Sequence, residues 1–193
     1  GGGARADGRV ETFYYVVSGA VDLTVDGRRH PLGSGGYALV PPTADHAVVA
    51  TADARLIQLK KAYEPLAGVT PPGLLVGDAA KVPGEVYLGD EGARLQTLIP
   101  DQPAYDMAMN IFTFETGHSL PVVETHVMEH GLWFLQGKGL YYLDDTWMEV
   151  EHDDFIWMGP YVPQSYYATG PVASKYLYYK NVNREIPVSP PRA

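Results

Sequence analysis

A short segment in the second half of the chain concentrates side chains that can bind a metal ion. Residues 124–130 read Glu-Thr-His-Val-Met-Glu-His, so Glu124 and His126 point to the same face if the segment is extended. His130 follows, and Gln164 comes from a separate predicted strand downstream. Imidazole nitrogens with carboxylate and amide oxygens suit Mn²⁺, Fe²⁺ or Zn²⁺, and the chain has no cysteine for a thiolate site. Four protein ligands leave two positions of an octahedral ion for substrate or water, which indicates a catalytic site.

The surroundings of this motif matter, because two nearby histidines also occur by chance. The motif runs into an apolar predicted strand, Leu132–Leu135, and then Gly137. It resembles the first motif of the cupin family, H-x-H-x₃-E-x₆-G, with the first His and the Glu exchanged. The segment 159–164, Gly-Pro-Tyr-Val-Pro-Gln, resembles the second cupin motif with Gln164 in the place of a ligand His.

An internal repeat organises the chain. Residues 11–19 (ETFYYVVSG) match residues 129–137 (EHGLWFLQG) at an offset of 118, and the same offset continues without a gap. Further pairs are Asp26 and Asp144, Tyr37 and Phe155, Pro42 and Pro160, His46 and Gln164 and, after one inserted residue, Lys61 and Lys180. The repeat predicts a first unit over residues 1–66, a Pro/Gly-rich linker over 67–92 and a second unit over 93–193.

Composition predicts that both units are all-β. Gly (21), Pro (16) and Tyr (14) are frequent, as in short strands joined by turns. Residues 13–17, 21–25 and 37–40 read as strands, and Asp26-Gly27 supplies the positive φ angles of a tight hairpin turn. Residues 89–98 are ambiguous between helix and strand. We therefore expect two tandem cupin (jelly-roll) β-barrels, a bicupin.

The repeat also serves as a control for the metal site. Subtracting the offset from the four ligand positions leads to Ala6, Gly8, Thr12 and His46, of which only His46 can coordinate an ion. The first unit is therefore expected to be a degenerate cupin that lacks its first strands, with His46 an ordinary barrel histidine.

The other histidines are weaker candidates. His30 and His152 lie in turn-like polar surroundings and are expected to be exposed, and His118, next to Gly117, either borders the entrance to the site or has no part in it.

Charge and hydropathy exclude several classes of protein. A net charge of −9 without any run of Lys or Arg argues against nucleic-acid binding. No apolar stretch reaches the roughly 18 residues of a membrane span. Since no targeting segment is visible, a cytoplasmic location is expected. The expected partners are a small polar substrate and further copies of the chain as a homo-oligomer.

Several sequence blocks resemble one specific family, the bicupin (S)-ureidoglycine aminohydrolases of allantoin (purine) degradation. The blocks are Glu11–Val16, Gly36–Pro42, Lys61–Leu66, Glu124–Gly131, Tyr161–Gln164 and Tyr178–Asn181. The resemblance implies an Mn²⁺ enzyme that converts (S)-ureidoglycine to (S)-ureidoglycolate and ammonia. Its metal ligands fall on Glu124, His126, His130 and Gln164, and its substrate-binding residues fall on Glu124, Tyr141, Tyr176 and Lys180.

The residue types agree with these roles. Lys180 shares a strand face with Tyr176, by the period of two, and its ammonium could pair with the substrate carboxylate. We take Glu124 and Lys180 as the catalytic residues. Plain core packing is the competing interpretation for Tyr141 and Tyr176, and a solvated strand end is the competing interpretation for Lys180.

Two other functional classes stay open at this point. The same ligands could hold Fe²⁺ in a cupin oxygenase, although such sites more often use three His and a Glu or two His and a carboxylate. A non-catalytic cupin that binds a small molecule is the third class. Oxygen uptake discriminates the oxygenase from the hydrolase.

Overall fold

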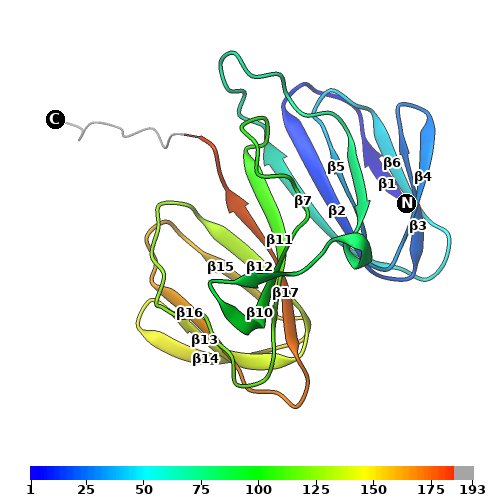
Figure 1. The fold of residues 1–193 in the computed structure, drawn as a ribbon. Helices are drawn as coiled ribbons and strands as arrows, with labels where there is room; N and C mark the ends of the chain where they lie inside the picture. The colour runs from blue at the N-terminus through cyan, green and yellow to red at the C-terminus, as the bar shows by residue number, and fades with distance from the viewer. Residues whose placement is uncertain (185–193) are drawn as a thin grey trace. The chain divides into compact units, whose positions relative to one another are not determined.

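The computed structural model describes residues 1–184, in which the chain folds as two compact units (Figure 1). The first unit runs from Gly1 to Pro83 and the second begins at Gly84. Both are built almost entirely from β-strands, as the frequent turn residues and β-branched and aromatic residues predict. The expected all-β fold of two consecutive units is confirmed.

The first unit consists of two four-stranded antiparallel sheets. One sheet has the order β1-β6-β3-β4 and the other has the order β7-β2-β5-β8. Their bounds are β1 Gly2–Ala4, β2 Val10–Ser18, β3 Ala20–Val25, β4 Arg28–Gly33, β5 Gly36–Val40, β6 His46–Ala50, β7 Arg55–Ala62 and β8 Leu75–Asp78. A short 3₁₀ turn, η1 (Ala79–Lys81), follows β8.

The second unit has a six-stranded and a three-stranded antiparallel sheet. The strand orders are β15-β12-β17-β11-β10-β9 and β14-β13-β16. Their bounds are β9 Glu85–Tyr87, β10 Asp90–Thr97, β11 Met107–Phe114, β12 His130–Gln136, β13 Lys138–Leu143, β14 Thr146–Glu151, β15 Phe155–Met158, β16 Gln164–Ala168 and β17 Ser174–Asn181. The segment that was ambiguous between helix and strand, 89–98, is largely β10.

Strand pairing reproduces the offset of 118 from β2 to β6 and from β12 to β16. In the last strand the expected match of Lys61 with Lys180 is wrong by one residue, because Thr12 pairs with Lys60 as His130 pairs with Lys180. In the first unit Tyr15 pairs with Tyr37, and in the second unit Trp133 pairs with Phe155, at the offset of 118. Each unit also has a register shift in the equivalent place, between Val16 and Ser18 and between Phe134 and Gln136. The hairpins match as well, since β3 with β4 and β13 with β14 start and end at corresponding positions. The repeat found in the sequence is therefore a structural repeat.

Local backbone chemistry explains the turns. Asp26 and Gly27 have φ values of 46° and 78°, as a tight two-residue hairpin requires. Gly19 and its counterpart Gly137 have φ values of 80° and 76°, and a Cβ on either would collide with the backbone of a neighbouring segment. Glycine is needed at both positions for this reason.

The segment expected as a linker, 67–92, is largely structured. β8 pairs with β5, with Leu75 opposite Leu39, and so completes a sheet of the first unit. β9 pairs with β10 in the second unit. The division therefore lies between Pro83 and Gly84 instead of spanning the whole Pro/Gly-rich stretch.

Each unit has its own apolar core between its sheets. In the second unit Phe114, Phe134 and Tyr166 are completely buried, and in the first unit Val16, Leu23 and Ala38 are. Alternate residues of each strand supply these side chains, and in the second unit the same inward alternation carries Tyr141, Tyr176 and Tyr178. Within residues 1–184, no helix is long and apolar enough to cross a membrane.

Candidate metal centre and active site

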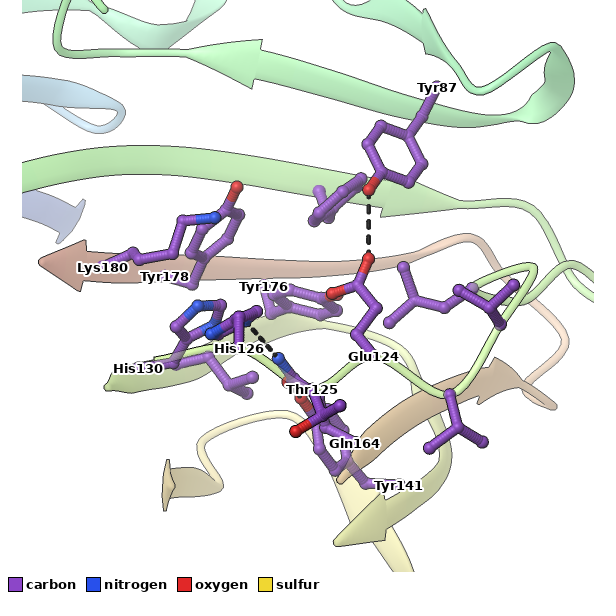
Figure 2. A pocket seen from close by; sticks show the side chains of 15 residues that line it. Tyr87, Glu124, Thr125, His126, His130, Tyr141, Gln164, Tyr176, Tyr178 and Lys180 are labelled. Atoms are coloured by element: carbon purple, nitrogen blue, oxygen red, sulfur yellow. Dashed lines mark hydrogen bonds between the residues drawn. The ribbon is translucent and has the colours of Figure 1, made fainter. Parts of the chain in front are cut away.

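A cavity of about 420 Å³ in the second unit contains every residue that the sequence singles out for chemistry. Figure 2 shows the side chains that line it. They come from strands β9, β11, β12, β13, β16 and β17 and from the irregular segment between β11 and β12. The expected site residues among them are Glu124, His126, His130, Tyr141, Gln164, Tyr176 and Lys180. Polar and aromatic side chains share the wall, so the cavity suits a small polar molecule.

The six-stranded sheet positions one side of the cavity. Tyr176, Tyr178 and Lys180 alternate along β17 and all line the cavity, as the period of two predicts. Lys180 of β17 lies opposite His130 of β12 in the strand register, so the two residues are neighbours across the pair of strands. On the other sheet, Tyr141 of β13 and Gln164 of β16 are directed into the same cavity (Figure 2).

Backbone hydrogen bonds fix the irregular segment that carries Glu124 and His126. The Glu124 N–H donates to the Gln164 carbonyl at 2.8 Å, and the Gln164 N–H donates back to the Glu124 carbonyl at 2.9 Å. The Tyr161 N–H donates to the His126 carbonyl at 2.7 Å, and the Thr125 hydroxyl donates to the Tyr161 carbonyl at 2.8 Å. The Pro-containing turn around Tyr161, at a φ of 65°, thus holds the His126 backbone in place.

The two imidazoles lie side by side at one end of the cavity. The ring centroids of His126 and His130 are 4.3 Å apart with an interplanar angle of 25°. The Gln164 Nε2 lies 3.1 Å from the His126 Nε2, and the Gln164 Oε1 accepts a hydrogen bond from the Tyr141 hydroxyl at 2.6 Å. Three of the four expected ligands therefore meet.

The fourth expected ligand, Glu124, is directed toward Tyr87. Its Oε1 accepts a hydrogen bond from the Tyr87 hydroxyl at 3.1 Å (Figure 2). Within residues 1–184, no group of three His, Asp or Glu side chains lies close enough together to hold a metal ion as the side chains stand. Three rotatable bonds separate the Glu124 carboxylate from its backbone, and the Oε2 atom is not engaged by Tyr87.

Burial determines the proton affinities around the cavity. Desolvation, together with the nearby His126 and Lys180, lowers the pKa of His130 from 6.5 to about 3, so the imidazole is neutral at pH 7. Burial also lowers the pKa of Lys180, and the carboxylates of Glu124 and Asp101 oppose this shift. The pKa values of Tyr87 and Tyr178 rise to about 12, chiefly through burial, so both keep their hydroxyl protons.

The donor set fits a divalent metal ion. Both His130 Nε2 and His126 Nδ1 are buried without a hydrogen-bond partner, and neutral imidazoles are the form that binds metals. Rotation of the Gln164 amide by 180° exchanges its nearly isosteric ends and presents Oε1 toward His126, and Tyr141 can accept from the amide nitrogen in that arrangement. Two nitrogens, an amide oxygen and a carboxylate suit Mn²⁺, Fe²⁺ or Zn²⁺.

Two cavity residues, Tyr178 and Tyr87, are not among the predicted site residues. Tyr178 stacks on His130 with centroids 5.7 Å apart and accepts a hydrogen bond from the Asn110 side chain at 2.8 Å. Its place on the strand face of Tyr176 and Lys180 is a signal that could have found it. Tyr87 lies far from every motif in sequence, and no pattern points to it.

The first unit carries no equivalent of this site among the described residues. His46 is buried, and its Nε2 lies 2.9 Å from the Tyr14 hydroxyl. Burial lowers its pKa. Ala4, not Ala6, is the structural counterpart of Glu124, because Ala4 pairs with His46 as Glu124 pairs with Gln164. The shift of two residues leaves the conclusion unchanged, since neither alanine can bind a metal.

The remaining histidines lie outside the cavity. The His118 Nδ1 pairs with Asp90 at 2.8 Å, and its ring packs against Gly92, so His118 fastens the β9–β10 hairpin and does not line the cavity. His152 is exposed as expected. His30 is half-buried, which differs from the expectation of exposure.

Comparison with known proteins finds relatives that match over most of this chain. The (S)-ureidoglycine aminohydrolase of Escherichia coli (strain K12) is 35% identical over 182 residues, which cover 93% of this chain and 69% of that protein. The chain belongs to the (S)-ureidoglycine aminohydrolase family. The Arabidopsis thaliana member of the family is 39% identical over 91% of this chain and 58% of its own length.

A family model and a solved structure support the cupin fold. The model of the cupin domain matches residues 6–59, within the first unit. The crystal structure of a Pseudomonas aeruginosa protein described as glyoxylate-induced has a TM-score of 0.89 and 36% identity, over 97% of this chain and 72% of that one. The expected bicupin fold is thereby confirmed.

Proposed function

We propose that this chain hydrolyses (S)-ureidoglycine to (S)-ureidoglycolate and ammonia with one divalent metal ion, Mn²⁺, in the cavity of the second unit. Family membership supports the reaction. The observation that carries the proposal for the site is that one cavity gathers the predicted imidazoles, amide, carboxylate and lysine. The metal would be held by Glu124, His126, His130 and Gln164, and it would supply a Lewis acid and a template for the substrate.

The chain's own residues account for substrate binding. The substrate carries a carboxylate, an amine and a ureido group on one carbon. The partly buried Lys180 ammonium pairs with the carboxylate, and the Tyr141 and Tyr176 hydroxyls face the polar remainder of the substrate. Burial raises the pKa of Tyr176 well above 10, so its hydroxyl stays a neutral hydrogen-bond donor.

The reaction breaks one C–N bond and forms one C–O bond. The protonated amine leaves as ammonia with the electron pair of the C–N bond, while the ureido nitrogen lone pair forms a C=N bond to the same carbon. Water then adds to that carbon and releases a proton. The Glu124 carboxylate accepts a hydrogen bond from the departing amine and holds it on one side, which leaves the other face to water and defines the stereochemistry.

Ammonia release from (S)-ureidoglycine tests the proposal directly. The full chain is stripped with chelator, reloaded with Mn²⁺, Fe²⁺ or Zn²⁺, and assayed under anaerobic conditions. We expect turnover without oxygen and highest with Mn²⁺. Oxygen consumption with an organic acid substrate, in place of ammonia release, would overturn the hydrolase and favour a cupin oxygenase. A cytoplasmic location and a homo-oligomeric state remain predictions, which fractionation and light scattering can test.

A further inference from the structure

We propose that Tyr87 is a positioning residue for Glu124, which it orients so that one carboxylate oxygen remains available to the metal ion. This inference rests on the metal site of the proposed function. No motif contains Tyr87, and its role follows from the contacts that it makes.

The Tyr87 hydroxyl directs the Glu124 side chain. The backbone of Glu124 is fixed by its two hydrogen bonds with Gln164, but three rotatable bonds separate that backbone from the carboxylate. The hydrogen bond from Tyr87 to Oε1, at 3.1 Å, restricts this freedom. Since Oε1 accepts from Tyr87, Oε2 is the oxygen left to bind a cation or the substrate amine.

Packing fixes the Tyr87 ring itself. The ring lies edge-on to Phe112 of β11, with centroids 4.7 Å apart and an interplanar angle of 86°. Phe112 in turn stacks on Tyr178, which stacks on His130. Tyr87 is thus held by the same aromatic wall that supports an expected metal ligand, so its hydroxyl has a defined position relative to the site.

The hairpin that carries Tyr87 is also held in place. Tyr87 pairs with Asp90 across a two-residue turn, in which Leu88 has a φ of 47° and Gly89 a φ of 82°. A positive φ is unfavourable for leucine and persists only where the surroundings enforce it. Asp90, which follows this turn, is itself held, because it accepts a hydrogen bond from the Gly92 N–H at 2.9 Å and lies 2.8 Å from His118 Nδ1.

These contacts make Tyr87 a hydrogen-bonding support for a ligand. Removing a hydrogen bond that orients a metal-binding carboxylate typically weakens metal binding roughly 10- to 100-fold. Tyr87→Phe removes the hydroxyl and keeps the ring that packs on Phe112. The expected result is therefore a dissociation constant for Mn²⁺ that rises by roughly 10- to 100-fold, with unchanged circular dichroism and melting temperature.

The experiment titrates MnCl₂ into the metal-free full chain by isothermal calorimetry, without substrate. Tyr142→Phe is the matched control, because Tyr142 packs at a tilt against Trp147 and does not line the cavity, so its affinity should equal that of the wild type. A Tyr87→Phe affinity within threefold of the wild type, or a tighter one, would overturn the role of Tyr87. A wild type that binds no Mn²⁺ would overturn it together with the metal site. A wild type that binds Mn²⁺ but releases no ammonia from ureidoglycine overturns the proposed substrate alone.

Discussion

Replacement of Lys180 by alanine distinguishes the two interpretations of this residue, which are a lysine that binds the substrate and a solvated lysine at a strand end. Lys180 is partly buried, and desolvation lowers its pKa against the opposing effects of Glu124 and Asp101. If its ammonium pairs with the substrate carboxylate in the cavity, its removal leaves that carboxylate unpaired. Truncation of one partner of such a pair costs about 2–5 kcal/mol. At about 1.4 kcal/mol per tenfold, kcat/KM falls by roughly 30-fold to several-thousandfold, and the partial exposure of Lys180 favours the lower part of this range.

The assay measures ammonia release under kcat/KM conditions, alongside the bound metal. Metal content should stay unchanged, because a protonated lysine has no lone pair to donate. Lys180→Arg should rescue only in part, since a planar guanidinium is larger and differently directed. Lys61 is the matched control. It is the partner of Lys180 in the sequence repeat, and its ammonium contacts Glu64 at 3.5 Å. The strand register shows instead that Lys60 is the structural counterpart, because Lys60 pairs with Thr12 as Lys180 pairs with His130. Lys61→Ala should leave turnover near that of the wild type. A Lys180→Ala variant that keeps more than a third of wild-type kcat/KM, or that loses the metal, refutes the reasoning.

The other predictions concern metal binding and pH. His126→Ala and His130→Ala should each abolish metal binding and ammonia release while circular dichroism stays unchanged; an unfolded variant would indicate a structural metal. Metal analysis should find one ion per chain, and His46→Ala should not reduce this number. In EDTA, the free energy of unfolding should fall as the pH drops below about 6.5, by at most about 1.4 kcal/mol per pH unit from His130. The sign follows from its folded pKa of about 3, because the unfolded chain binds this proton first. His130→Asn should flatten that decline in a denaturant titration.

The sequence was sufficient to predict the repeated parts of the fold. Residues related by the constant offset occupy equivalent positions in equivalent strands, so Trp133 and Phe155 pair as Tyr15 and Tyr37 do. Period two then places Tyr176 and Lys180 on one strand face. Both predictions depend on the regular alternation of side chains along a strand, which tertiary contacts do not change.

The remaining features depend on contacts between distant segments. The Tyr87 hydroxyl donates a hydrogen bond to Glu124 from β9, an edge strand. This strand lies in the segment that was predicted to be a linker because of its Pro and Gly content. Nothing local in sequence reveals that pairing. Ala4, and not Ala6, is the counterpart of Glu124, because the segment that joins this position to the repeated strand is longer in the first unit than in the second. No residue types are shared in that segment, so the sequence alone could not align it.

The paired turn glycines have a consequence for how this chain can evolve. Gly19 and Gly137 both adopt a positive φ against neighbouring backbone, whereas the positions of Glu124 and His130 are occupied by Ala4 and Thr12 in the first unit. The backbone geometry of a turn restricts the residue type in both units, but metal binding restricts the residue type only in the unit that binds the metal. The first unit can therefore accept substitutions at the positions that correspond to the ligands, whereas a side chain at either turn glycine would disrupt its own unit.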